Sequence, residues 1–140
     1  MQFWLVKQEP TEYSWQQFCQ DGHTVWNGVR NYQARNYLKA MNLGDCVLFY
    51  HSNVGKEIVG IAQVTKTAYP DPTAVDSPWA AVDIKPIQTL NKTVTLEQLK
   101  QIPDLSQLGL LKQARLSVMP IQPAEFQLIL EISDTKLTFN

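Results

Sequence analysis

The chain has few of the residues that build metal sites and disulfide frameworks. Its 140 residues include two cysteines and two histidines. Cys19 falls in a helical pattern and Cys46 in an apolar strand pattern, and neither has the spacing of a metal-ligand set. With only His23 and His51 to add, the sequence predicts no metal site and no cofactor. Both thiols are expected to be buried.

Long apolar runs and an excess of positive charge are also missing. No run approaches the roughly 18 apolar residues that span a bilayer, and the first residues do not form a basic and apolar leader. We therefore expect a cytoplasmic protein without a membrane partner. The formal net charge is −1, with 12 Lys and Arg against 13 Asp and Glu. Because sequence-independent affinity for nucleic acid comes from Lys and Arg that neutralise phosphates, any nucleic-acid binding should be local and selective.

What is present suits one folded domain over residues 1–140. Hydrophobic residues make up 44% of the chain, which is enough to bury a core. No internal repeat, low-complexity tract or linker divides the sequence into parts. We expect a monomer or a weak homodimer.

Apolar patterning predicts several short strands. Continuous apolar runs at residues 3–6, 46–50 and 59–64 are typical of strands buried on both faces. Residues 80–85 alternate between apolar and polar, the pattern of a half-buried strand. The turn residues of segment 51–56 predict a hairpin between two of these strands.

Local end signals predict helices between and after the strands. Ser14 and Thr95 stand where an N-cap is expected, each with a glutamine three residues later, and Pro123 suits a first helical turn. Short strands with isolated helices predict a mixed α/β (α+β) fold, a small curled β barrel with flanking helices, and argue against a doubly wound sheet. The expected helices span about residues 15–20, 31–41, 96–101 and 123–132.

Residues 26–35 gather groups that suit a flat, polar ligand. Trp26 offers a ring for stacking, and Gly28 permits a sharp turn or a close approach of the backbone. Arg30 and Arg35 carry the forked donors that bind phosphate. These features favour a nucleotide. The alternative is structural, with a core tryptophan, a turn glycine and arginines on the solvated face of the next helix.

Sequence blocks along nearly the whole chain resemble the EVE-domain family. Residues 4–10 read WLVKQEP, and Tyr13-Ser14 follows. Gln8 stands where the family usually has serine. The family belongs to the PUA-like superfamily, beside the YTH readers of methylated adenine. The later blocks, in family order, are WNGVRNYQARN (26–36), GDCVLFYHSN (44–53), IVGIAQV (58–64), AYPDPTA (68–74), VTLEQLK (94–100) and LLKQARLSVMPI (110–121).

The resemblance implies a non-catalytic module that reads a modified base in DNA or RNA. By family analogy the base is a modified cytosine, flipped into a pocket whose aromatic wall corresponds to Trp26. Stacking on such a wall is worth roughly 1–3 kcal/mol and discriminates little among bases. Selectivity must therefore come from polar groups at the base edge. Glu9 and Asn27 are the polar candidates nearest to the expected wall.

The candidate residues form an expected base pocket and an expected set of phosphate contacts. Alternation along residues 115–118 predicts that Arg115 and Ser117 share one face. Residues 69–73 form a loop stiffened by two prolines, which suits a pocket wall. The expected phosphate contacts are Arg30, Arg35, Lys39 and Arg115. The expected pocket residues are Lys7, Glu9, Trp26, Asn27, Val29, Asn31, Tyr50, His51, Ser52, Tyr69 and Ser117.

Each of these residue types also has a purely structural interpretation. Glu9 can cap backbone groups, Tyr50 can be a core aromatic, and His51 can be a hydrogen-bonded turn residue. Arg115 can pair with a carboxylate at the sheet edge, and the loop at residues 69–73 can be a stiff connector. The sequence leaves both interpretations open.

Two other function classes compete with a base reader. The ASCH group, also PUA-like, includes small hydrolases, so a hydrolase acting on a modified nucleoside is the alternative. Such an enzyme needs an activated nucleophile or water, which Lys7, Glu9, His51 and Ser117 supply only if they converge. A protein-interaction module ranks last, because the apolar residues follow core periodicity and predict no large exposed stripe.

Overall fold

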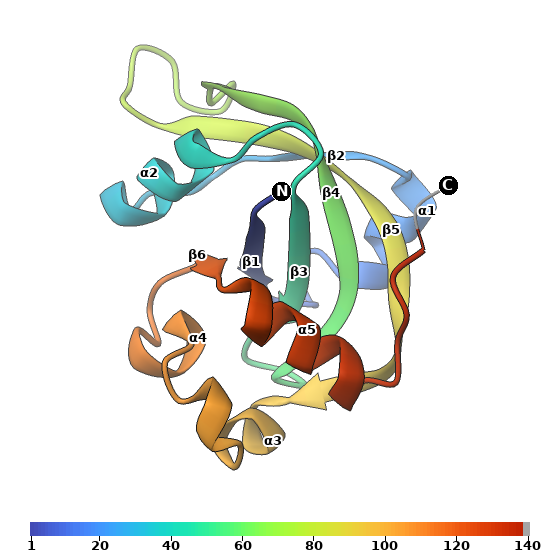
Figure 1. The fold of residues 1–140 in the computed structure, drawn as a ribbon. Helices are drawn as coiled ribbons and strands as arrows, with labels where there is room; N and C mark the ends of the chain where they lie inside the picture. The colour runs from blue at the N-terminus through green and yellow to red at the C-terminus, as the bar shows by residue number, and fades with distance from the viewer. Residues whose placement is uncertain (139–140) are drawn as a thin grey trace.

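The computed structural model describes residues 1–138 as one mixed sheet with helices around it (Figure 1). Its six strands follow the order β2-β5-β4-β3-β1-β6, with β1 and β3 parallel and the other neighbours antiparallel. The expected mixed α/β fold is confirmed. The strands are β1 (Phe3–Gln8), β2 (Thr24–Trp26), β3 (Cys46–His51), β4 (Glu57–Pro70), β5 (Ala80–Thr95) and β6 (Val118–Ile121). The helices are α1 (Trp15–Asp21), α2 (Tyr32–Ala40), α3 (Leu96–Lys100), the 3-10 helix η1 (Pro103–Leu105), α4 (Gly109–Lys112) and α5 (Pro123–Ile132).

The sheet curls without closing into a barrel. Trp26 on β2 and Phe49 on β3 are separated in the sheet by β5 and β4, yet their ring centroids lie 5.6 Å apart. Register shifts at several points along β4 and β5 allow this bend, because bulges increase local twist. Within residues 1–138 the edge strands β2 and β6 do not pair with each other. Instead α2 packs against β6 as well as β4 and β5, and it buries Ala34 and Leu38 there.

Helix ends follow the local signals closely. Ser14 Oγ accepts from Gln17 N at 3.0 Å, and Gly22 with φ 72° ends α1. Gln17 does not complete a capping box, because its side chain donates to Asp21 instead. Thr95 does form a capping box on α3, and α5 begins at Pro123 as expected.

Two sequence-based expectations are wrong in their details. Residues 114 and 115 lie in a turn and Ser117 in a bend, so Arg115 and Ser117 do not alternate along a strand. Pairing of β6 with β1 begins at Val118, and the Lys7 side chain of β1 donates to the preceding turn at Ala114 O. Cys19 is exposed on α1, while Cys46 is buried as expected.

No helix within residues 1–138 is long and apolar enough to cross a membrane.

A buried carboxylate fastens the start of β1 to the start of β3. Asp45 Oδ2 accepts from Trp4 Nε1 at 3.0 Å and from Asn42 N at 2.9 Å, and Oδ1 accepts from Gln2 N at 3.0 Å. Each carboxylate oxygen is thus satisfied although Asp45 is only 2% exposed. This arrangement keeps the two parallel strands in register at one end, so that their other ends meet on the same side of the molecule.

Gly60 on β4 lets the Trp15 ring lie directly against the sheet. A Cβ atom at Gly60 would come within 2.2 Å of Trp15 Cζ2, which no packed structure tolerates. The Trp15 ring is held from its other side by edge contacts with Phe18 and Phe49, at centroid distances of 5.5 and 5.4 Å. Its indole N–H donates to Thr89 Oγ1 at 2.9 Å, so the ring cannot simply turn away.

We expect Gly60→Ala to lower the free energy of unfolding by at least about 2 kcal/mol, the range of core overpacking. Urea denaturation followed by circular dichroism measures the change. Gly109→Ala is the matched control, because its new Cβ meets the flexible Met119 side chain at 3.2 Å and little loss is expected. The Gly60→Ala penalty should shrink in a Trp15→Phe background. An equal penalty in both backgrounds would show that the ring contact is not its cause.

Candidate nucleic-acid interface

The carboxyl ends of β1 and β3 bring several expected pocket residues together. The strands are parallel, with Lys7 beside Tyr50 and Gln8 beside His51. Beyond the strands, Ser52 N donates to Gln8 O at 2.9 Å. We call this the strand-end group, and its members are Lys7, Glu9, Tyr50, His51, Ser52 and Ser117.

Lys7 joins the strand-end group to the turn before β6. Its backbone N donates to Ser117 O at 2.9 Å, and its Nζ donates to Ala114 O at 2.8 Å. Burial lowers the pKa of Lys7 and raises the pKa of Tyr50, which is 3% exposed. Lys7 therefore holds the turn that carries the exposed Arg115 against the sheet. A contact of Lys7 with a base remains a prediction.

His51 has one ring nitrogen engaged by the backbone of α1. Its Nε2 accepts from Trp15 N at 3.0 Å. Burial lowers the pKa of His51, and the nearby charge of Glu57 opposes that effect only in part. The ring is therefore neutral near pH 7, and because a neutral imidazole has one acceptor and one donor, Nδ1 carries the proton. His51 is the hydrogen-bonded residue of the structural interpretation, with one donor left over.

Glu9 sits in the turn that follows β1, and its side chain is only partly engaged. Its Oε1 accepts from Asn53 Nδ2 at 2.6 Å, while its backbone O accepts from Glu12 N and Tyr13 N. The carboxylate is half-buried. Since a carboxylate accepts about four hydrogen bonds, Glu9 keeps capacity for a ligand donor.

Trp26 lies inside the curl of the sheet. It is 5% exposed, and its ring meets Phe49 edge-on. Phe49 in turn contacts His51, at 5.7 Å between ring centroids, which links Trp26 to the strand-end group. Val29 is also buried, at 7%. A base would have to displace the groups that cover this indole before stacking on it, so its role as a pocket wall remains a prediction.

The loop after Trp26 is fastened to the β4–β5 connection by Asp71, and we call this contact the Asp71 clamp. Asp71 Oδ2 accepts from Gly28 N at 2.8 Å and from Arg30 Nη1 at 3.0 Å. Its Oδ1 accepts from Thr73 N at 2.7 Å and Thr73 Oγ1 at 2.6 Å. Burial alone raises the pKa of Asp71, but these hydrogen bonds outweigh it and lower the pKa to about 2. Gly28 suits this turn because its φ of 80° lies in the left-handed region.

Two of the three arginines expected at phosphates, Arg30 and Arg35, have partners within the chain. Arg30 is bound to the Asp71 clamp, with Nη2 donating to Thr73 Oγ1 at 3.0 Å. Arg35 donates to Asn36 Oδ1 at 2.8 Å and to Pro78 O at 3.3 Å, and it lies over the Tyr32 ring. These contacts leave both residues at the surface with only part of their donors free. Sequence reasoning missed Asp71, although a carboxylate between two prolines was a signal for a preset loop.

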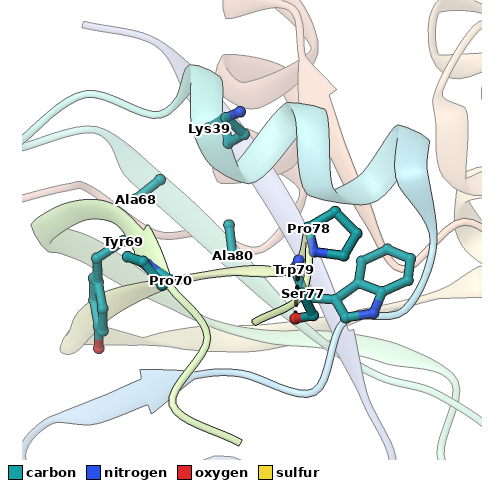
Figure 2. A pocket seen from close by; sticks show the side chains of 8 residues that line it. All are labelled: Lys39, Ala68, Tyr69, Pro70, Ser77, Pro78, Trp79 and Ala80. Carbon is teal, nitrogen blue, oxygen red and sulfur yellow. Dashed lines mark hydrogen bonds between the residues drawn. The ribbon is translucent and has the colours of Figure 1, made fainter. Parts of the chain in front are cut away.

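The remaining expected residues divide between the two ends of the sheet. Asn27 is exposed, and Asn31 caps α2 by accepting from Ala34 N at 2.9 Å. Tyr69 and Lys39 line a separate hollow beside the β4–β5 connection (Figure 2). The hydroxyl of Tyr69 donates to Asp83, and its pKa is raised to about 12 by burial and by this carboxylate. Tyr69 lies near the opposite end of β4 from Glu57, the residue that pairs with His51, and a contact of Tyr69 with the base remains a prediction.

A comparison with known families assigns the chain. The family model described as "EVE domain" matches residues 2–132. The chain belongs to the EVE-domain family. Mouse thymocyte nuclear protein 1 is 34% identical over 168 residues, which cover 96% of this chain and 74% of the mouse protein. For the human protein the identity is also 34%, covering 79% of this chain and 60% of the human protein. This EVE domain therefore spans only part of its curated relatives.

Solved structures share the fold of this EVE domain. A protein from Agrobacterium tumefaciens has a TM-score of 0.95 at 38% identity, covering 96% of this chain and 94% of that chain. The human THYN1 protein, in complex with 5-methylcytosine containing DNA, has a TM-score of 0.90 at 30% identity. The match covers 97% of this chain and 99% of the human chain. A YTH domain from Zygosaccharomyces rouxii, in complex with N6-methyladenosine RNA, has a TM-score of 0.61 at 18% identity. That last likeness concerns the fold alone. The expected PUA-like fold is confirmed.

We expect Asp71→Asn to lower the free energy of unfolding by about 2 kcal/mol at pH 7. The size follows from the pKa of Asp71, which is about 2 in the folded protein and 3.8 for an ordinary aspartate. A lowered pKa means that the stabilisation is complete above pH 3.8 and is lost as the pH falls toward 2. The difference in the free energy of unfolding between the wild type and Asp71→Asn should therefore be smaller in acid. Urea titrations at pH 7 and pH 3 measure it. Asp76→Asn, in the same loop and exposed, is the control. Equal losses in both variants would argue against the clamp.

We expect the stability of the wild type to fall as the pH drops below 6.5, through the lowered pKa of His51. Above pH 6.5 its contribution is constant. His51→Gln retains an acceptor near the position of Nε2, so the variant should fold with a smaller change in Tm between pH 7.5 and 5. His23→Gln replaces the other histidine, which is exposed, and should leave that change intact. An unchanged pH dependence in His51→Gln would show that His51 is not its source.

Proposed function

We propose that this EVE domain is a non-catalytic module that binds nucleic acid and reads a modified base, a modified cytosine. The observation that carries the proposal is the likeness, over 97% of this chain, to the human THYN1 protein bound to 5-methylcytosine containing DNA. At 30% identity and a TM-score of 0.90, the likeness includes the elements that carry the strand-end group. The net charge of −1 agrees with recognition of a particular base, since the chain lacks the excess positive charge of a general binder.

The strand-end group offers the hydrogen-bonding pattern that a cytosine edge requires. Cytosine presents an amino group that donates, with a ring nitrogen and a carbonyl oxygen that accept. Glu9 has free acceptor capacity and His51 has a free Nδ1–H, so together they complement such an edge. Trp26, two ring contacts away from His51, supplies an aromatic surface once its cover is displaced. In this proposal Arg30, Arg35, Lys39 and Arg115 contact phosphates.

The geometry of His51 argues for binding rather than hydrolysis. A general base must offer a free lone pair on an atom within about 2.6–3.2 Å of the heavy atom whose proton it takes. The lone pair of His51 Nε2 is already used by Trp15 N at 3.0 Å. Pairing with Ser52 or Ser117 would require that bond to break. Lys7 Nζ, another candidate base, is bound to a backbone carbonyl.

Binding to matched oligonucleotides tests the proposal. We expect the wild type to prefer DNA or RNA that carries 5-methylcytosine over the unmodified oligonucleotide of the same sequence, measured by fluorescence anisotropy. Glu9→Gln should weaken binding of the preferred base by about tenfold, or about 1.4 kcal/mol, because it replaces a charged acceptor at the base edge. Glu12→Gln, exposed in the same turn, is the control and should bind as the wild type does.

The same samples test the alternative. After long incubation the oligonucleotides are analysed by mass spectrometry for a released base or an altered nucleoside. A product that forms with the wild type and disappears with His51→Ala would establish a hydrolase and overturn the proposal. Equal affinity for modified and unmodified oligonucleotides, with no product, would also contradict base reading.

A further inference from the structure

The hollow between α2 and the β4–β5 connection is a second candidate binding site. Its volume is about 280 Å³. Figure 2 shows Lys39 on α2 above it, with Tyr69 near the end of β4 and Trp79 in the connection, directly before β5. We call it the hairpin hollow. Its lining residues are Lys39, Ala68, Tyr69, Pro70, Ser77, Pro78, Trp79 and Ala80.

The lining of the hairpin hollow is apolar with a cation beside it. Ala68 and Ala80 have small side chains and Pro70 and Pro78 have compact rings, which leaves room between the strands. No lining residue is acidic, and Lys39 is exposed. Of the two carboxylates close by, Asp71 is paired with Arg30, whereas Asp83 keeps its charge and accepts from the Tyr69 hydroxyl. Among the lining residues themselves, the charged side chain is the Lys39 cation.

Trp79 is held firmly in position before any ligand arrives. Its ring lies 4.9 Å from the Tyr32 ring, and the Arg30 guanidinium carbon lies 5.8 Å from its centroid. Its backbone O accepts from Asp71 N at 3.0 Å. Yet Trp79 remains partly exposed. A fixed, partly exposed ring favours stacking, because little conformational entropy is lost when a planar group binds to it.

We propose that the hairpin hollow is a subsite for a nucleotide of the same strand, several positions away from the base that is read, with its base against Trp79 and its phosphate at Lys39. This inference rests on the proposed function. The volume falls just below the roughly 300–1,000 Å³ of sites for drug-sized ligands, which suits a single nucleotide unit better than a folded peptide segment. The positive charge and the aromatic wall are the two features that single-stranded nucleic acid uses.

The Asp71 clamp connects this subsite to the loop that follows Trp26. Asp71 accepts from Gly28 N and from Arg30 on one side, and its own N donates to Trp79 O on the other. Arg35, which donates to Pro78 O, stands at the rim of the same hollow. The loop that follows Trp26 and the subsite are therefore already fixed to each other before a nucleic-acid strand binds.

The experiment compares a 9-mer single-stranded DNA, carrying one central 5-methylcytosine, with its unmodified counterpart and with the nucleoside 5-methyl-2′-deoxycytidine. Lys39→Gln should weaken binding of both 9-mers by 3–10-fold and reduce the slope of log K against log salt by about 0.7, the value for one phosphate on a single strand. The preference for the modified 9-mer and the affinity for the nucleoside should not change. Lys100→Gln, exposed on α3, is the matched control and should bind as the wild type does.

Trp79 is tested by substitution and by spectroscopy. Trp79→Leu should weaken binding of the 9-mers about tenfold, while Trp79→Phe, which keeps an aromatic ring, should recover most of that loss. In the wild type the indole N–H resonance of Trp79, assigned from Trp79→Phe, should shift with the 9-mer and stay in place with the nucleoside.

The two proposals fail in different ways. If the wild type binds modified and unmodified 9-mers equally, base reading is wrong. The subsite is then still tested by whether Lys39→Gln reduces the slope of log K against log salt. If the wild type prefers the modified 9-mer but Lys39→Gln and Lys100→Gln behave alike and the Trp79 resonance does not shift, the subsite is wrong. Binding of a proline-rich peptide in the hollow that the 9-mer fails to displace would also overturn it.

Discussion

The packing of aromatic rings around Phe49 is the constraint on which the rest of the structure depends. Trp15, Phe18 and Trp26 approach Phe49 at centroid distances of 5.4–5.6 Å, and they come from α1 and β2. These contacts hold β2 across β3 although two strands separate them in the sheet. The bare backbone of Gly60 gives Trp15 the space to take part. The curl that results determines where the loop after Trp26 begins.

A buried carboxylate then determines where that loop ends. The oxygens of Asp71 accept hydrogen bonds from backbone and side-chain donors of both the loop and the hairpin. These bonds compensate the free-energy cost of removing its charge from water. The same contacts use part of the positive charge of Arg30. The positive charge available to phosphates is thereby limited on this face.

Features that depend on neighbours in sequence were predictable, and features that depend on distant partners were not. The caps at Ser14 and Thr95 and the helix start at Pro123 are contacts within four residues, so local signals suffice. The buried strands were evident from their apolar runs. The exposed Cys19 and the turn at Arg115 were not, because side-chain alternation alone does not say which face meets the core. The length of β4 and β5 was underestimated because their polar ends resemble loops.

For the candidate site, the sequence by itself determined the family, the fold class and the residue types available for binding. The tertiary structure alone decided their partners. Arg30 meets Asp71 across 41 positions and His51 meets Trp15 across 36, and both contacts form only after the strands have paired and curled. Those contacts set the charge of the loop and the tautomer of the imidazole. Tyr69 and Lys39 lie away from the strand-end group because Tyr69 and the partner of His51 stand near the two ends of the long strand β4, a separation that residue types do not encode.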